Sequence, residues 1–172
     1  MGLRELKKEL NKLDKKQLID LVADLYKKNK GAKEYLDFYV TPNETELFEK
    51  YRDKVFDAFY PKRGGHYLNL REGKKAINDF KKLAPSAALV ADLMLFYVET
   101  GVQFTLEFGD IDEAFYSSMT STYSAALTLM AKEDLLEQFA DRAAQVVQDT
   151  LDKGWGFHDT LYSIHWEFYP EH

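Results

Sequence analysis

The sequence predicts an all-α protein of seven to eight helices, arranged as a compact bundle or a short stack of helical hairpins. Apolar residues recur at three- and four-residue spacing along most of the chain, which is the period of an amphipathic helix. Four segments carry N-terminal capping boxes, and no run of alternating β-branched residues indicates a strand. No fixed-period repeat is visible, which slightly favours the bundle.

The chain opens with two predicted helices and a short third segment. Leucines recur at helical spacing over residues 3–13. Asp14 is the expected N-cap of the next helix, with Gln17 as its capping-box partner, and an apolar stripe over residues 18–25 continues it. The stripe then fades, and a short segment over residues 33–40 carries Tyr35, Leu36 and Tyr39.

Two further capping signals open the middle helices. Thr41 as N-cap and Pro42 at the first helical position predict a helix that runs to about residue 60. Asn69, followed three residues later by Glu72, predicts another helix that runs to about residue 83. The segment between these helices contains Pro and paired Gly and is therefore expected to be a loop.

The longest apolar helix is expected over residues 87–108. It is hydrophobic almost all round, which is typical of a central helix wrapped by others. Gly109 ends it, and a capping box of Asp110 and Glu113 opens the next helix. The later helices are expected over residues 113–130, over 136–151 with Gly154 as the terminating residue, and over 157–168.

Composition favours one globular domain over residues 1–172. The 45% hydrophobic residues and the 12 Phe and 11 Tyr are enough to build a core. The absence of Cys excludes disulfides, thiolate metal sites and cysteine nucleophiles. There is no apolar run of signal-peptide type, and Asp92 interrupts the most apolar stretch, so a cytoplasmic protein without a membrane span is expected.

Charge is divided between the two halves of the chain. Residues 1–83 hold 20 Lys and Arg against 14 Asp and Glu, a net charge of +6. Residues 84–172 hold 3 against 15, a net charge of −12. Such a division indicates either a basic surface for an anionic partner or two halves that attract each other.

The loop and helix that follow residue 60 are candidates for binding a polyanion such as nucleic acid. Cations beside flexible Gly residues suit phosphate contacts. Against this, acidic residues interleave with the lysines of the first hairpin, and the sequence pI near 5.3 is wrong for a dedicated nucleic-acid binder. The candidate residues are Lys62, Arg63, Arg71, Lys74 and Lys75.

Three polar residues share one face of the expected central helix. Asp92, Glu99 and Gln103 are spaced at i, i+7 and i+11. Carboxylates in an apolar setting are candidates for general acid or base chemistry. Alternatively, this face is the one strip of the helix exposed to solvent, or Glu99 pairs with an Arg or Lys.

The last helix carries the second pocket candidate, His158 with Asp159. His158 and His165 are two turns apart, about 10 Å along the helix axis, which is too far for both to ligate one ion directly. A border of the core on which His and Tyr keep their polar tips in water explains the pattern more simply. We therefore assign no catalytic, metal-binding or cofactor-binding residue, and no cofactor is expected.

Several blocks resemble an uncharacterised bacterial protein family catalogued as domain of unknown function 6155. They are the leucine-rich opening that leads into Lys33-Glu34-Tyr35-Leu36-Asp37, and the segments of residues 91–99, 109–116 and 154–159. The resemblance covers nearly the whole chain. It implies an all-helical cytoplasmic protein and supplies no activity or functional residues.

The sequence therefore favours a binding protein over an enzyme. The leading hypothesis is a protein–protein interaction module, in which a protein partner or a second copy docks on exposed aromatics such as Tyr35, Phe38 and Tyr39. The alternative is nucleic-acid or polyanion binding through the basic half. A further alternative is an enzyme or metal protein that uses Asp92, Glu99 and the His158-Asp159 pair.

Overall fold

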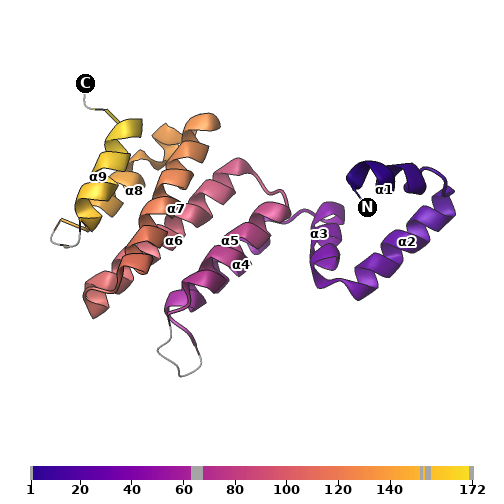
Figure 1. The fold of residues 1–172 in the computed structure, drawn as a ribbon, viewed down its shortest axis with the longest axis horizontal. Coiled ribbons are helices and arrows are strands. Elements are labelled where there is room, and N and C mark those ends of the chain that lie inside the picture. The colour runs from indigo at the N-terminus through magenta and orange to yellow at the C-terminus, as the bar shows by residue number, and fades with distance from the viewer. Residues whose placement is uncertain (1, 63–67, 152, 154–155, 171–172) are drawn as a thin grey trace. The chain divides into compact units, whose positions relative to one another are not determined.

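A computed structural model describes residues 2–62, 68–151, 153 and 156–170 of the chain. The chain divides into two compact units, Met1–Asn43 and Glu44–His172. Figure 1 labels the helices in chain order. The described residues form nine helices and no strand, so the all-α prediction is confirmed and the predicted count of seven to eight is too low.

The first unit holds the helices α1 (Leu3–Leu10), α2 (Lys15–Lys28) and α3 (Lys30–Val40). The additional helix arises at Asn29, which ends α2 and also caps α3, since its side chain accepts a hydrogen bond of 2.9 Å from the Ala32 amide. The helix α3 therefore starts three residues before the short segment of residues 33–40.

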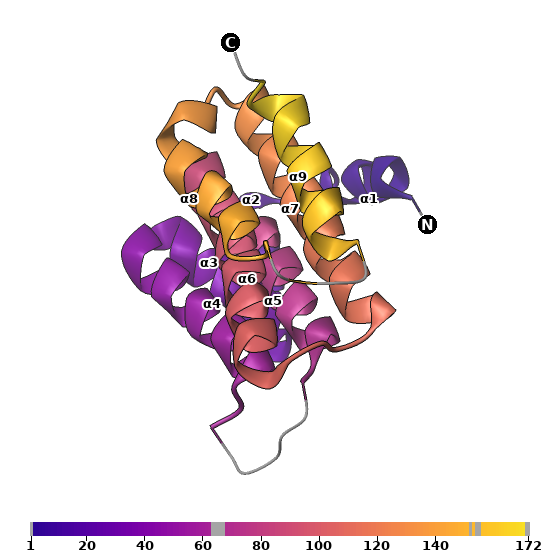
Figure 2. The same ribbon diagram turned by 90° about the vertical axis from the view of Figure 1, so that its left-hand side faces the viewer.

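The second unit is built from three helical hairpins that lie side by side (Figures 1 and 2). Its helices are α4 (Glu44–Phe59), α5 (Leu70–Lys82), α6 (Ala87–Phe108), α7 (Glu113–Lys132), α8 (Leu136–Gln148) and α9 (Phe157–Phe168). The hairpin of α6 and α7 lies between the other two, because α6 contacts both α4 and α8 and α7 contacts α9.

The core of the second unit is centred on α6 and α7. The helix α6 buries residues around most of its circumference, as its apolar sequence predicts. The helix α7 crosses it closely at Gly101, where a Cβ atom would overlap the side chain of Met119. A buried hydrogen bond of 2.8 Å joins Tyr97 Oη to Ser118 Oγ across this contact. Gly101 and Ser118 therefore allow the two helices to pack closely.

Two of the four predicted capping signals mark the observed helix starts, and two do not. Asp14 and Gln17 form the expected reciprocal pair, and Asn69 caps α5 through the Glu72 amide. The helix α4, however, begins at Glu44 and not at Pro42. Likewise Asp112, not Asp110, caps α7 by accepting from the Phe115 amide at 2.8 Å.

The helix α8 ends at Gln148, three residues before the expected position, and Gly154 lies outside the described residues.

By length and composition alone, α6 is apolar enough to cross a membrane. More than half of that span is buried inside the protein, which is what a core helix requires.

Candidate functional site

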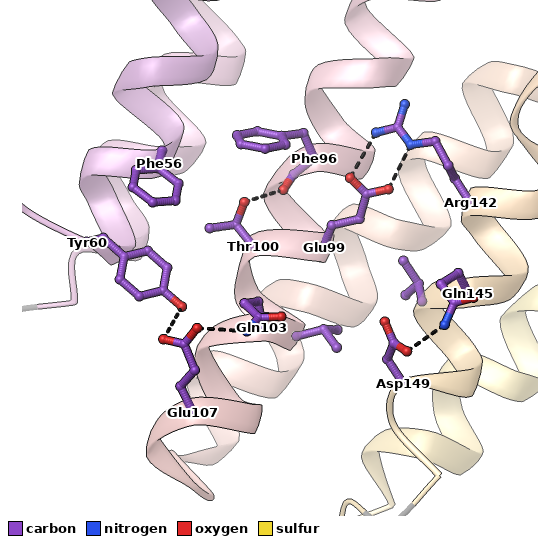
Figure 3. A pocket seen from close by; sticks show the side chains of 12 residues that line it. Phe56, Tyr60, Phe96, Glu99, Thr100, Gln103, Glu107, Arg142, Gln145 and Asp149 are labelled. Carbon is purple, nitrogen blue, oxygen red and sulfur yellow. Dashed lines mark hydrogen bonds and ion pairs between the residues drawn. The ribbon is translucent and has the colours of Figure 1, made fainter.

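A pocket of about 470 Å³ lies between α4, α6 and α8 of the second unit. Figure 3 shows α4 on one side, with Phe56 and Tyr60. Their rings stack with centroids 4.9 Å apart and form an aromatic wall. The opposite wall comes from α8 with Arg142, Gln145 and Asp149. The volume lies within the range of about 300–1,000 Å³ that is usual for small-molecule sites.

The floor of the pocket is a strip of α6 that turns away from the core. Phe96, Glu99, Gln103 and Glu107 recur at helical spacing and are half-buried or exposed, whereas most of their neighbours are buried. Asp92 begins the same strip, one turn before Phe96, but it is not among the lining residues. The predicted common face of Asp92, Glu99 and Gln103 is therefore the exposed strip of a central helix.

Arg142 ties this strip to α8. Its Nε and Nη2 donate to the two carboxylate oxygens of Glu99 at 2.8 and 2.9 Å, a bidentate pair, and its Nη1 donates to Asp92 Oδ1 at 2.7 Å. The hydrogen bonds to Glu99 raise the pKa of Arg142 above its usual value, so the guanidinium stays charged. The structure thus supports pairing of Glu99 with an Arg, one of the explanations that the sequence left open.

Two further carboxylates line the pocket at the C-terminal ends of α6 and α8. Glu107 accepts from Tyr60 Oη at 3.0 Å and from Gln103 Nε2 at 2.7 Å. Burial and the hydrogen bond to Glu107 raise the pKa of Tyr60 to about 12. Asp149 accepts from Gln145 Nε2 at 2.6 Å. The lining therefore contains three carboxylates and one guanidinium, and that guanidinium is already shared with Asp92.

His158 and Asp159 do not join this pocket. His158 Nδ1 lies 3.2 Å from both the Val147 carbonyl and Thr150 Oγ1, at the C-terminal end of α8. Asp159 is exposed in the first turn of α9. His165 bonds Tyr123 through Nδ1 at 2.9 Å, so each histidine has a structural partner at the edge of the core. Among the described residues there is no group of three or more His, Asp or Glu that could hold a metal ion.

The polyanion candidates have nearby partners of their own. Lys62 Nζ lies 3.9 Å from Asp53 and 3.6 Å from Asp57, and Lys75 lies 3.6 Å from Glu72. Lys74 donates to Ser121 Oγ at 3.1 Å, and its partial burial lowers its pKa. Arg71 is exposed, and Arg63 lies outside the part of the chain that the structure describes.

The first unit offers a surface of a different kind. None of its three helices buries a residue. The apolar stripe of α2, which consists of Leu18, Leu21, Val22 and Leu25, is largely exposed, with Leu25 at 49%. Of the predicted aromatic anchors, Tyr35 and Tyr39 are exposed on α3 and Phe38 is half-buried.

The sequence did not predict the α4 and α8 sides of the pocket. Residue 60 marks only the expected end of a helix, and nothing in that segment links Phe56 or Tyr60 to Glu107, which lies 47 residues further along the chain than Tyr60. Arg142 did leave a signal, since it is the one Arg in the strongly acidic half of the sequence. An isolated cation among many carboxylates is a natural partner for a carboxylate that points out of a central helix.

A family model described as "Family of unknown function (DUF6155)" matches residues 1–169. The match covers nearly the full length, as the sequence blocks implied. No curated protein and no solved structure matches the chain.

Proposed function

We propose that this chain, which belongs to the DUF6155 family, is a helical protein-interaction module that binds its partner through the first unit. The observation that carries the proposal is the apolar stripe of α2. Leu21, Val22 and Leu25 are each nearly half exposed, on a unit whose helices bury no residue. Helices this short owe most of their stability to packing of an apolar face, so a partner that covers the stripe would stabilise them.

Charge favours a partner with carboxylates beside an apolar surface. The first 43 residues contain 10 Lys and Arg and 7 Asp and Glu, a net charge of +3. Exposed lysines lie at both ends of α2, for example Lys15 and Lys27. Two copies that met through this unit would bring like charges together, which disfavours self-association through this face. We therefore propose a different protein, acidic at the contact, in the cytoplasm.

Site-specific photo-crosslinking in the organism that encodes the chain tests this proposal. A photoreactive phenylalanine would replace Leu21 or Leu25, one at a time, and Ala23 as the matched control. Ala23 is exposed on the same helix but about 200° from Leu21 around its axis. The expected result is a discrete adduct with another protein from positions 21 and 25, which is absent from position 23 and is lost when the other stripe leucine is changed to Glu.

The possible outcomes distinguish a protein partner from self-association and from nucleic-acid binding. An adduct with a second copy would assign the stripe to self-association, and an adduct with nucleic acid would favour the polyanion alternative. Equal labelling from positions 21, 23 and 25, or no protein adduct from any of them, would contradict a dedicated interaction surface on α2.

A further inference from the structure

The pocket between α4, α6 and α8 has the chemistry of a site for an organic cation. Its lining contains the carboxylates of Glu99, Glu107 and Asp149 against the single guanidinium of Arg142. The guanidinium is engaged by Glu99 and Asp92 through three of its donors, so it is poorly placed to hold an anion. The net charge of the lining is therefore negative, with two carboxylates that no guanidinium neutralises.

Helix ends add to this negative potential. Glu107 lies in the last turn of α6, and Asp149 is the C-cap of α8. The C-terminus of a helix carries a partial negative charge, which is normally complemented by a basic residue there. The helices α2, α5 and α7 follow that rule with lysines, whereas α3, α4, α6 and α8 have no basic residue in the last turn. At the pocket, α6 and α8 instead end with the carboxylates of Glu107 and Asp149, an arrangement that a bound cation would relieve.

Among the described residues, no ion pair joins a Lys, Arg or His to Glu107 or Asp149. Lys62 is within 4 Å of Asp53 and Asp57 of α4. Arg52 lies over the Phe96 ring, with 4.6 Å from its guanidinium carbon to the ring centroid. His158 contacts the Val147 carbonyl of α8 from α9. None of these three side chains is among the lining residues.

The aromatic wall indicates the chemistry of the rest of the ligand. Phe56 and Tyr60 stack on the α4 side of the pocket, where Tyr60 donates to Glu107, and Asp149 lies on the α8 side (Figure 3). Aromatic faces attract cations and also provide apolar contact for a hydrocarbon body. We propose that this pocket binds a small organic ammonium ion, with the ammonium group between Glu107 and Asp149 and the apolar body against Phe56 and Tyr60. The shared chemistry is an alkylammonium, carried either by a free amine or by a lysine side chain.

Calorimetric titration with matched probes tests the proposal. The probes are 2-phenylethylammonium, its neutral counterpart 2-phenylethanol and the anion 3-phenylpropanoate, each added to the full chain at neutral pH. The ammonium is expected to bind about tenfold more tightly than the alcohol and the anion not to bind. This preference should shrink as salt is added, because the pocket is open to solvent. Nα-acetyl-lysine methylamide is the second cation, and whichever of the two cations binds more tightly identifies the source of the ammonium.

Two variants test whether the ammonium binds at Glu107 and Asp149. The double substitution Glu107→Gln and Asp149→Asn should reduce the ammonium to the affinity of the alcohol. Asp141→Asn, an exposed carboxylate of α8 outside the lining, should leave the affinity unchanged. Equal affinities for ammonium and alcohol, tightest binding of the anion, no saturable binding of the ammonium, or a preference that survives the double substitution would each overturn the proposal. The comparison of ammonium with alcohol uses the unaltered chain and holds even if the double variant fails to fold.

Discussion

Arg142 and His165 show how single residues set the electrostatics of the second unit. Arg142 forms ion pairs with Asp92 and Glu99, so the carboxylates of the pocket that it does not pair with are those of Glu107 and Asp149. At the opposite side of α8, Tyr123 donates its one proton to the Ala143 carbonyl at 2.9 Å. The same Tyr123 oxygen lies 2.9 Å from His165 Nδ1.

Burial lowers the pKa of His165 from its ordinary 6.5. The unfolded chain therefore binds this proton more readily than the folded chain, and the free energy of unfolding should fall as the pH drops below 6.5 through the depressed folded pKa. Urea unfolding of the wild type and of His165→Gln between pH 7.5 and about 5 measures this contribution. We expect the difference between the two proteins to change with pH over that window. Two parallel profiles would show that His165 does not titrate with folding.

At the scale of elements, the crossing of α6 and α7 depends on Gly101. A Cβ atom there would overlap Met119, which is fully buried. Gly101→Ala is expected to lower the free energy of unfolding by about 1–2 kcal/mol, because overpacking outweighs the better helix propensity of Ala. Gly31→Ala on α3 is the control, since its nearest neighbour would be Asn29 Oδ1 at 3.4 Å.

The two glycine variants separate packing from propensity. Gly31→Ala should leave stability unchanged or raise it by up to about 1 kcal/mol. Chemical denaturation of the two variants and the wild type, followed by circular dichroism, gives the comparison. If Gly101→Ala stabilised the protein as Gly31→Ala does, the close packing of α6 on α7 would not limit the side chain at position 101.

The sequence predicted the start of a helix correctly where a single N-cap residue determines it. Asp14 and Asn69 act through hydrogen bonds within three residues, so the sequence alone contains the whole interaction. The start of α7 was wrong because Asp110 and Asp112 are both good caps. In the structure, Asp110 accepts from Tyr116 Oη at 2.8 Å, a contact six residues along the chain that a three-residue capping pattern does not include.

The pocket was predictable only in part, because its walls come from helices that are far apart in the sequence. The spacing of Asp92, Glu99 and Gln103 places them on one face of a helix, and the structure bears this out. Which helix faces that strip depends on how the hairpins stack, and helical periodicity carries no such information. The pairing of Arg142 with Glu99 joins residues 43 positions apart, and that of Tyr60 with Glu107 joins residues 47 apart.

At the scale of the whole molecule, part of the positive charge of the basic half lies beside carboxylates of that same half. The basic residues Lys62, Lys75 and Lys82 lie near carboxylates of their own half of the sequence: Asp53, Asp57, Glu72 and Asp79. Exposed pairs of this kind contribute little to stability. The net charges therefore bear on which partners each unit attracts, with an acidic protein proposed for the first unit and an ammonium ion for the pocket of the second.

The free energy of unfolding of the purified double variant Leu21→Glu, Leu25→Glu shows whether the apolar stripe of α2 is free for a partner. We predict a value within about 0.5 kcal/mol of the wild type, as for substitutions of exposed residues. A loss of about 2 kcal/mol or more would contradict a free stripe, because leucines whose replacement destabilises the isolated chain to that extent belong to its own core.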